Sequence, residues 1–263
     1  MKIQNKRVLI TGASGGIGQA IARDLVEHKA NVVLTGRRQD VLEGLAKELK
    51  CDFQVCDLSN PTELDKLIET IGSIDIYVAN AGIPGAGSTF DLGPEEIDRT
   101  IDVNLRAPIH SSMAFAREMA KQGSGHIVFI SSIAGLVTSP TTTLYCATKF
   151  GLRGFALSLR QELSDKNIGV SVILPGFINE AGMFANAKVD LPKVTRTKSP
   201  QDVSKAVIRA ITDNKAEILV APAELRFGSK LASVFPYLAE FVQNSRSARE
   251  AAAKLQQAQR NVK

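Results

Sequence analysis

The sequence predicts an α/β protein that forms a single domain, with a doubly wound, seven-stranded parallel sheet and helices on both faces. Short apolar runs alternate along the chain with stretches in which apolar residues recur at helical spacing. The apolar runs are continuous instead of alternating with polar residues, which is typical of strands buried on both faces. Strand and helix patterns repeat in turn without a break in composition, which favours one layered domain.

The predicted strands are short runs rich in Val, Ile and Leu, bounded by Gly, Asn, Ser or Pro. They are residues 8–10, 31–34, 53–56, 74–79, 126–130, 170–174 and 217–220. The predicted helices lie between them, at residues 17–29, 41–49, 63–71, 95–121, 144–163 and 203–211. The fourth should bend near Pro108, and Ser199-Pro200 supplies a capping hydroxyl and a first-turn proline for the last.

Composition and charge limit the possible functions. The 263 residues are 44% hydrophobic and 22% charged, as in ordinary globular proteins. The net charge of +5 is compatible with binding to nucleic acid, to an acidic membrane or to an anionic small molecule. No zinc spacing or ribonucleoprotein motif is present, so we expect no nucleic-acid partner. The basic residues near the end of the chain are interpreted as a solvated helical tail: Arg246, Arg249, Lys254, Arg260 and Lys263.

The cysteines and the amino terminus indicate a cytoplasmic protein. Cys51, Cys56 and Cys146 have no paired spacing, which argues against a disulfide framework or a metal site and fits a reducing compartment. The apolar run of MKIQNKRVLI is too short for a signal peptide. No stretch approaches the ~20 apolar residues of a membrane span.

A glycine-rich turn follows the first predicted strand and opens the first helix. It reads Thr11-Gly12-Ala13-Ser14-Gly15-Gly16-Ile17-Gly18. Glycines let the backbone approach a pyrophosphate, and the helix amino terminus offers N–H groups and a positive dipole. This is the strand–turn–helix context of a Rossmann-like dinucleotide site, so Gly12, Ser14, Gly16, Ile17 and Gly18 are predicted to bind the cofactor; the alternative is a turn that needs only flexibility.

The end of the second strand indicates which dinucleotide is bound. An NAD site usually has Asp or Glu there, about 20 residues past the turn, whereas this chain has Gly36-Arg37-Arg38. A guanidinium matches a ribose 2′-phosphate and can stack on adenine. We therefore predict NADP(H), bound through Arg37; the alternative is a pair of solvated arginines.

Tyr145 and Lys149 are four residues apart in a predicted helix and should share one face. An ammonium beside a phenol favours the phenolate and lowers the tyrosine pKa. Such a pair would act as a general acid and base, although a core tyrosine with a snorkelling lysine has the same spacing.

Several motifs in one order resemble the short-chain dehydrogenase/reductase family, over roughly residues 6 to 220. The matching segments are TGASGGIG at 11–18, Cys56-Asp57-Leu58, Asn80-Ala81-Gly82, Val103-Asn104-Leu105, Ser131 to Gly135, Tyr145 to Lys149 and Pro175-Gly176. The resemblance implies an NADP(H)-preferring oxidoreductase that interconverts a carbonyl and a primary or secondary alcohol by hydride transfer.

The resemblance also implies roles for single residues. The catalytic set would be Asn104, Ser132, Tyr145 and Lys149, with Ser132 and Tyr145 binding the substrate oxygen. Lys149 would tune Tyr145 and bond the nicotinamide ribose, and Asn104 would hold a water behind Lys149. Further cofactor contacts would come from Asp57, Leu58, Asn80 and Ile178, together with Tyr145 and Lys149.

One position departs from the family pattern. Glu180 stands where many relatives have a threonine, and a carboxylate would repel a pyrophosphate. A substrate lid is expected over about 180–199, where apolar and basic residues mix, so the substrate is expected to be a lipophilic carbonyl or alcohol. The alternative for this segment is a mobile, solvated loop.

The expected organisation is a Rossmann-like catalytic domain over 1–222, with 223–263 as a helical extension of the same domain. Apolar residues from Leu231 to Val242 recur at helical spacing, and Pro236 should interrupt them. We expect this stripe to pack, either over the active site or between subunits; contact with a membrane surface is the less favoured alternative.

Two other functions stay open at this point. One is reduction of a 3-oxoacyl thioester, and the other is NADP(H) sensing or interaction without catalysis. The family resemblance further implies a homodimer or homotetramer.

Overall fold

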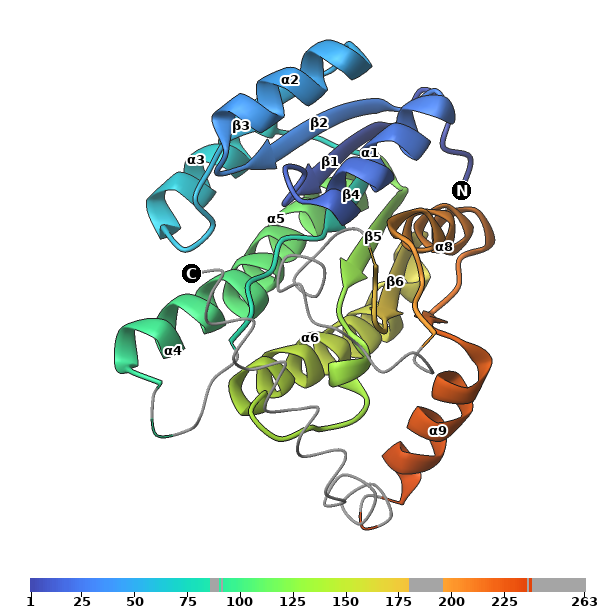
Figure 1. Cartoon of the computed structure of the whole chain (residues 1–263). Coiled ribbons are helices and arrows are strands. Elements are labelled where there is room, and N and C mark those ends of the chain that lie inside the picture. The colour runs from blue at the N-terminus through green and yellow to red at the C-terminus, as the bar shows by residue number, and fades with distance from the viewer. Residues whose placement is uncertain (86–89, 91, 180–195, 236, 238–263) are drawn as a thin grey trace.

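A computed structural model describes residues 1–85, 90, 92–179, 196–235 and 237 (Figure 1). Its centre is a seven-stranded sheet in the order β3-β2-β1-β4-β5-β6-β7, and every neighbouring pair is parallel. The strands are β1 (Arg7–Thr11), β2 (Asn31–Gly36), β3 (Asp52–Val55), β4 (Ile76–Ala79), β5 (Gly125–Ile130), β6 (Ile168–Pro175) and β7 (Glu217–Val220). The predicted doubly wound α/β fold is confirmed.

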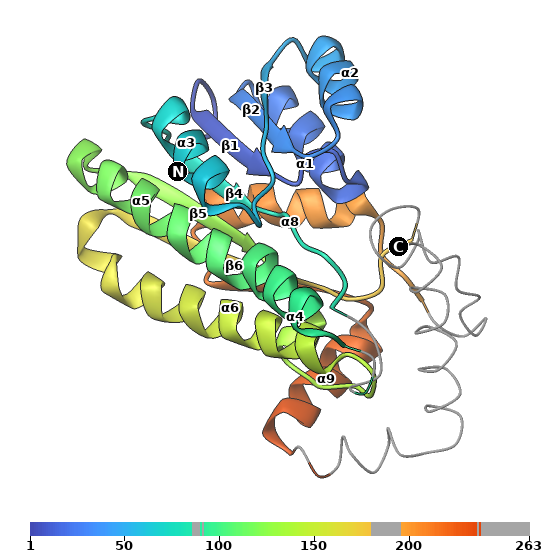
Figure 2. The ribbon, with the colours of Figure 1, turned by 90° about the vertical axis from the view of Figure 1, so that its left-hand side faces the viewer.

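Helices cover both faces of this sheet (Figure 2). They are α1 (Gly16–Glu27), α2 (Gln39–Leu49), α3 (Pro61–Ile71), α4 (Pro94–Ile101), α5 (Ala107–Gln122), α6 (Thr143–Glu162), α8 (Pro200–Asp213) and α9 (Ala223–Val234). Short 3₁₀ turns occur at Ile133–Gly135 and Ser164–Lys166.

Two apolar cores lie on opposite faces of the sheet. Val8 and Ile10 of β1 join the core under α1, α2 and α8, whereas Leu9 between them joins the core under α3, α5 and α6. Successive side chains of a strand point to opposite faces, so a continuous apolar strand is buried on both sides. This explains why the strands lack a polar–apolar alternation.

Local capping residues determine where two helices begin. The Asn60 side chain accepts hydrogen bonds from the backbone at the start of α3. Ser199 and Asp202 form a reciprocal capping box at the start of α8, and Pro200 follows the cap. The helix start predicted at Ser199-Pro200 is confirmed.

The predicted helix over 95–121 is divided by a π-helical segment, Asp102–Arg106, between α4 and α5. The N–H of Ala107 bonds the carbonyl of Asp102, five residues back. Pro108 has no N–H, so it cannot donate to the carbonyl of Asn104 as a regular helix would require. The irregularity therefore lies just before Pro108 and holds Asn104 within it.

The helix α9 extends the chain beyond β7. A Cβ built on Gly176 would lie 3.3 Å from a methyl of Leu225, so α9 packs against the turn after β6. Its apolar residues Phe227, Leu231 and Val234 are exposed. The helix ends at Val234, before Pro236, since a residue that precedes proline disfavours helical geometry.

Within the described residues, no helix is both long and apolar enough to cross a membrane. The division into a domain over 1–222 and an extension over 223–263 stays a prediction.

Candidate active site

The predicted site residues follow the carboxyl ends of several strands, which share one edge of the parallel sheet. Gly12 follows β1, Arg37 follows β2, Asn80 follows β4 and Gly176 follows β6. The strand order reverses between β1 and β4, where a doubly wound sheet opens a crevice for ligands.

The glycine-rich turn is held by close backbone contacts. Gly12 has a φ of 65°, a left-handed conformation that favours glycine. A Cβ on Gly18 would lie 2.4 Å from the carbonyl oxygen of Gly12, so only glycine fits there. The amide nitrogen of Asn80 donates to the carbonyls of Thr11 and Gly12 at 2.9 and 3.1 Å. Asn80 therefore holds the turn, and its amide nitrogen is already engaged by protein.

The amino terminus of α1 differs from those of α3 and α8. Its N-cap is Gly15, with no capping side chain, and its first turn holds no acidic residue. Asn60 and Ser199 cap the other two helices. The first N–H groups of a helix need acceptors and favour negative charge, so the start of α1 fits a diphosphate.

The two arginines after β2 take different positions. A guanidinium nitrogen of Arg38 donates to the carbonyl oxygen of Ser14 at 2.5 Å, and Gln19 donates to the same oxygen at 3.1 Å. Arg37 is exposed and its charge acts on Asp57. No pattern in the sequence predicted the bond from Arg38 to the glycine-rich turn.

Asp57 lies in a hydrogen-bonded and cationic environment. Burial raises the pKa of its carboxyl, but bonds from Ser59 and the charges of Arg37 and Arg99 outweigh burial, so the pKa is lowered. Arg99 of α4 lies 3.5 Å from this carboxylate. The neighbouring Leu58 is buried in the core under α3, α5 and α6.

Tyr145, Lys149 and Ser132 come together beside β5. The Lys149 ammonium lies 5.6 Å from the centre of the Tyr145 ring, so the two residues share one face of α6 as predicted. Burial raises the pKa of Tyr145 to about 12, although a hydrogen bond with Ser132 opposes this shift. Burial lowers the pKa of Lys149 to about 8. The predicted lowering of the Tyr145 pKa is therefore wrong here, because desolvation of the phenolate outweighs the hydrogen bond with Ser132.

Backbone groups hold Lys149 in place. Its ammonium donates to the carbonyl of Ile130 at 3.1 Å, and the Ser131 hydroxyl donates to the Lys149 carbonyl at 3.0 Å. The side chain is only 2% exposed. Ser132 begins the turn at Ile133–Gly135, and its hydroxyl accepts from the N–H of Ala134 at 3.1 Å.

Asn104 is fully buried and bonds both backbone groups of Ile83. Its side-chain oxygen accepts from the Ile83 N–H at 2.8 Å, and its amide nitrogen donates to the Ile83 carbonyl at 2.9 Å and to Thr148 at 3.4 Å. A Cβ on Gly82 would lie 3.5 Å from both the Asn104 oxygen and the Lys149 nitrogen. Asn104 and Lys149 therefore flank Gly82. No pattern in the sequence predicted the contacts of Asn104 with Ile83 and Thr148.

Part of the predicted site lies outside the described residues. Residues 180–195, which include Glu180 and most of the lid predicted over about 180–199, belong to this part. Ile178 is buried. It forms an isolated parallel β-bridge with Lys198, and the two residues lie on either side of residues 180–195 in the chain. Its side chain packs in the core under α1, α2 and α8.

Comparison with known proteins identifies the family. The model of the short chain dehydrogenase family matches residues 6–191. The chain belongs to this family. An uncharacterized oxidoreductase of Staphylococcus aureus (strain USA300) is 34% identical over 231 residues, covering 84% of this chain and 98% of the relative.

Two further proteins that are similar to this chain carry more specific descriptions. The ketoacyl reductase HetN of Nostoc sp. (strain PCC 7120) is 32% identical over 227 residues, covering 83% of this chain and 79% of its own. The structure of a short-chain dehydrogenase from Sphingobium yanoikuyae in complex with NADPH superposes with a TM-score of 0.78 at 25% identity, covering 92% of this chain and 97% of the other. The chain is thus an oxidoreductase of a family that binds NAD(H) or NADP(H), acts on small molecules and commonly forms oligomers.

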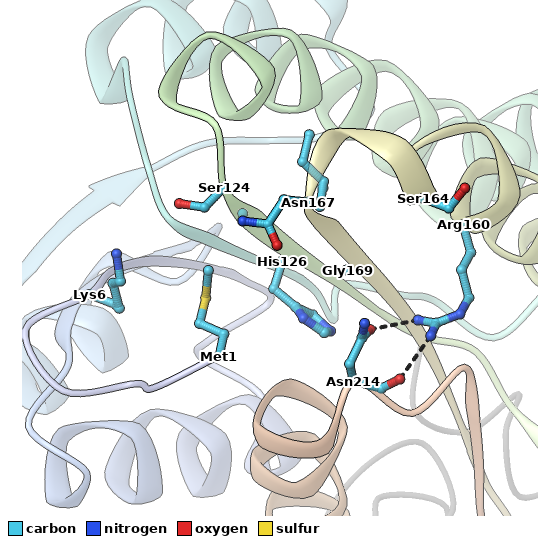
Figure 3. Close-up of a pocket in the computed structure, with 11 residues that line it drawn as sticks. Met1, Lys6, Ser124, His126, Arg160, Ser164, Asn167, Gly169 and Asn214 are labelled. Carbon is cyan, nitrogen blue, oxygen red and sulfur yellow. Dashed lines mark hydrogen bonds between the residues drawn. The ribbon is translucent and has the colours of Figure 1, made fainter.

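A cavity of about 420 Å³ lies at the amino ends of β5 and β6, on the opposite edge of the sheet from the predicted site (Figure 3). Arg160 points toward Asn214 there and donates to its carbonyl and side-chain oxygens, each at 2.8 Å. Lys6 pairs with Asp75 at 2.7 Å. Arg160 and Lys6 are already paired with protein groups, so we do not assign the active site to this cavity. Among the described residues, no three His, Cys, Asp or Glu side chains gather as metal ligands would.

Proposed function

We propose that this short-chain dehydrogenase uses NADP(H) to interconvert a carbonyl and a primary or secondary alcohol, with Tyr145 as the general acid and base. The observation that carries the proposal is the meeting of Tyr145, Lys149 and Ser132 beside β5, with Asn104 flanking the same space at Gly82. Hydrogen bonds to the backbone hold Lys149 and Asn104 in place, at Ile130 and Ile83.

The residues at the crevice fit a dinucleotide phosphate. The uncapped start of α1 would receive the diphosphate, through the turn that contains Gly12, Ser14, Gly16, Ile17 and Gly18. Arg37 would bind the 2′-phosphate, since no acid ends β2. Further contacts would come from Asp57, Leu58, Asn80, Tyr145, Lys149 and Ile178. When bound, the nicotinamide supplies or accepts the hydride.

The proton would move at the Tyr145 oxygen. In reduction Tyr145 gives its proton to the substrate oxygen, and the Ser132 hydroxyl donates a hydrogen bond to the same oxygen. A phenol with a pKa of about 12 is protonated at neutral pH and ready to act as an acid. The Lys149 ammonium, with its pKa lowered to about 8, stays mostly charged at pH 7 and stabilises the phenolate that remains.

The substrate is expected to be a lipophilic carbonyl or alcohol. Reduction of a 3-oxoacyl thioester is the alternative substrate class, and the resemblance to a ketoacyl reductase supports it. A cofactor-binding protein without catalysis is less well supported, because a sensor has no need of Ser132 and Lys149 around Tyr145.

Exposed residues on α5 and α6 support a homodimer or homotetramer. Met113 of α5 and Phe150 of α6 are large apolar side chains exposed at 44% and 40%. The nearby Gly154 of α6 is exposed, with nothing within 4 Å of a Cβ built there, and would let a second backbone approach closely. We propose that these two helices form a subunit interface.

The test is a set of initial rates for NADPH and NADH oxidation with steroids, retinal, medium-chain aldehydes, diketones, quinones, sugars and a 3-oxoacyl thioester. Faster turnover with NADPH and one of the lipophilic carbonyls would support the proposal. Turnover of the thioester alone would favour the alternative substrate class. Tight NADPH binding without any turnover would favour a sensor.

A further inference from the structure

The helix α9 has two distinct faces. The inner face holds Leu225, which packs at Gly176, and Ser229, which is 4% exposed. The outer face carries Phe227, Leu231 and Val234, exposed at 74%, 39% and 67%. Their spacing of four and three residues places them in one stripe along the helix. The helix therefore contacts the rest of the domain through few side chains, and its large apolar side chains face solvent.

Two further large apolar side chains are exposed just past the end of the helix. Phe235 and Tyr237 are exposed at 56% and 85%. Large apolar side chains that are exposed so near one another in the chain are typical of a docking site. Two aromatic rings at the end of a helix also suit a lipid–water boundary, where a phenol can reach water while its ring stays among acyl chains.

Basic residues accompany the apolar stripe. Arg226 and Lys230 are exposed on α9, while Glu224, the acid of its first turn, lies 4.0 Å from Arg196. The sequence from residue 223 to 263 holds seven Lys or Arg and three Asp or Glu, so four of the five net positive charges lie there. An anionic surface would complement this charge.

We propose that the outer face of α9 docks on the surface of a bilayer that contains anionic lipid. The helix has 12 residues, so it is ~18 Å long, well short of a ~30 Å hydrocarbon core. It would lie in the interface with its apolar stripe among the acyl chains and its basic residues at the head groups. In both ribbon views α9 lies at the periphery, away from the sheet (Figures 1 and 2).

Docking would couple the membrane to the catalytic edge of the sheet. The inner face of α9 packs on Gly176, at the turn that follows β6. That turn leads directly to Ile178, one of the predicted cofactor contacts. A membrane-bound α9 would thus hold the crevice close to a source of lipophilic substrate.

The experiment is co-sedimentation of the full chain with vesicles of phosphatidylcholine containing 30% phosphatidylglycerol, compared with phosphatidylcholine alone. Three double variants are compared with the unchanged chain. Phe227→Gln with Val234→Gln removes apolar area without changing charge. Arg226→Gln with Lys230→Gln removes two charges and keeps the apolar stripe. Lys121→Gln with Lys205→Gln removes the same charge from exposed sites on α5 and α8 and is the control.

We expect binding to the anionic vesicles that weakens as salt is raised. The apolar double variant should bind at least about 10-fold more weakly, given the transfer free energy of two apolar side chains. The basic double variant should lose about 30-fold at low salt, which is about 1 kcal/mol for each residue. The control should bind within about 2-fold of the unchanged chain. NADPH binding, measured on each variant, reports whether the fold is intact.

Two results would overturn the proposal. One is equal sedimentation of the unchanged chain and the apolar double variant with anionic vesicles. The other combines two observations: the unchanged chain does not bind vesicles, and light scattering shows that the Phe227→Gln, Val234→Gln variant loses its oligomeric state. That result would assign the stripe to contact with a second copy of the chain.

Discussion

The ammonium of Lys149 lies 5.6 Å from the ring centre of Tyr145, one helical turn away on α6. The cation is buried, and its one hydrogen bond to protein in the described residues goes to the Ile130 carbonyl. Burial opposes the charged form and lowers the pKa of Lys149 from 10.5 to about 8. The chain thus keeps a charge where an apolar residue would be more stable, as functional sites often do.

Lys149→Met should stabilise the protein at pH 7 and abolish turnover. The unfolded lysine titrates near 10.5 and the folded one near 8, so the charge costs about 3 kcal/mol below pH 8. Losing the bond to Ile130 offsets about 1 kcal/mol, which leaves a gain of about 2 kcal/mol. Urea unfolding of both proteins measures the difference.

The same lysine predicts a dependence on pH. Between pH 8 and 10.5 the unfolded chain binds the proton that the folded chain has lost, so stability of the unchanged protein rises with pH. The advantage of Lys149→Met should shrink over this window. Lys205→Met, at an exposed lysine of α8, is the control and should change stability little. A loss of stability in Lys149→Met at pH 7 would show that the buried charge is net favourable.

Arg37→Ala and Arg38→Ala should distinguish binding of the 2′-phosphate from support of the glycine-rich turn. Arg37 is exposed beside Asp57 and is proposed to bind the 2′-phosphate, so its loss should weaken NADPH binding at least about 10-fold and leave NADH binding nearly unchanged. Arg38 holds the carbonyl of Ser14 in the turn, so its loss should weaken both cofactors about equally. Fluorescence titration measures all four affinities. Equal weakening of NADPH and NADH by Arg37→Ala would contradict the 2′-phosphate assignment.

Gly18→Ala should destabilise the glycine-rich turn and reduce cofactor binding. Its methyl would lie 2.4 Å from the Gly12 oxygen and 2.8 Å from the Ala13 backbone, which forces the turn apart. Gly44→Ala is the matched control, in the exposed middle of α2 with nothing within 4 Å. It should stabilise the protein by about 0.5–1 kcal/mol, because alanine favours a helix. Equal thermal stability of the two variants would argue against the close contact at Gly18.

His126 should make the protein sensitive to acid. Burial, the amino terminus and Arg160 lower its pKa from 6.5 to about 3. The unfolded chain takes up a proton between these values while the folded chain does not. Stability should therefore fall as the pH drops below about 6.5, by up to ~1.4 kcal/mol per pH unit from this group.

His126→Gln should flatten that dependence, whatever its effect on stability at pH 7. His28→Gln, at an exposed histidine, should leave the slope unchanged. The measurement is urea unfolding at a series of pH values from 4 to 7. An unchanged slope in His126→Gln would mean that other groups account for the acid sensitivity.

The sequence was most informative where a local rule decides the structure. Continuous apolar strands specify a sheet covered on both faces, and Ser199-Pro200 specifies a helix start. Those features depend on neighbours in the chain, so they can be read from it.

Contacts between distant segments were harder to predict. Asn80 bonds the Thr11 and Gly12 carbonyls, and Asn104 bonds Ile83, across separations that no spacing rule describes. The pKa of Tyr145 is raised and not lowered, because burial, which comes from the whole fold, outweighs the hydrogen bond with Ser132. The choice between Arg37 and Arg38 also depends on which way each side chain turns at the end of β2.

The most direct test compares NADPH oxidation by the unchanged chain and by Tyr145→Phe, using the best carbonyl from the substrate panel. The variant lacks the proton donor but keeps the ring. Turnover should fall by at least about 100-fold while NADPH affinity stays within about 3-fold. Turnover that survives in Tyr145→Phe would contradict the role of Tyr145 as the general acid and base.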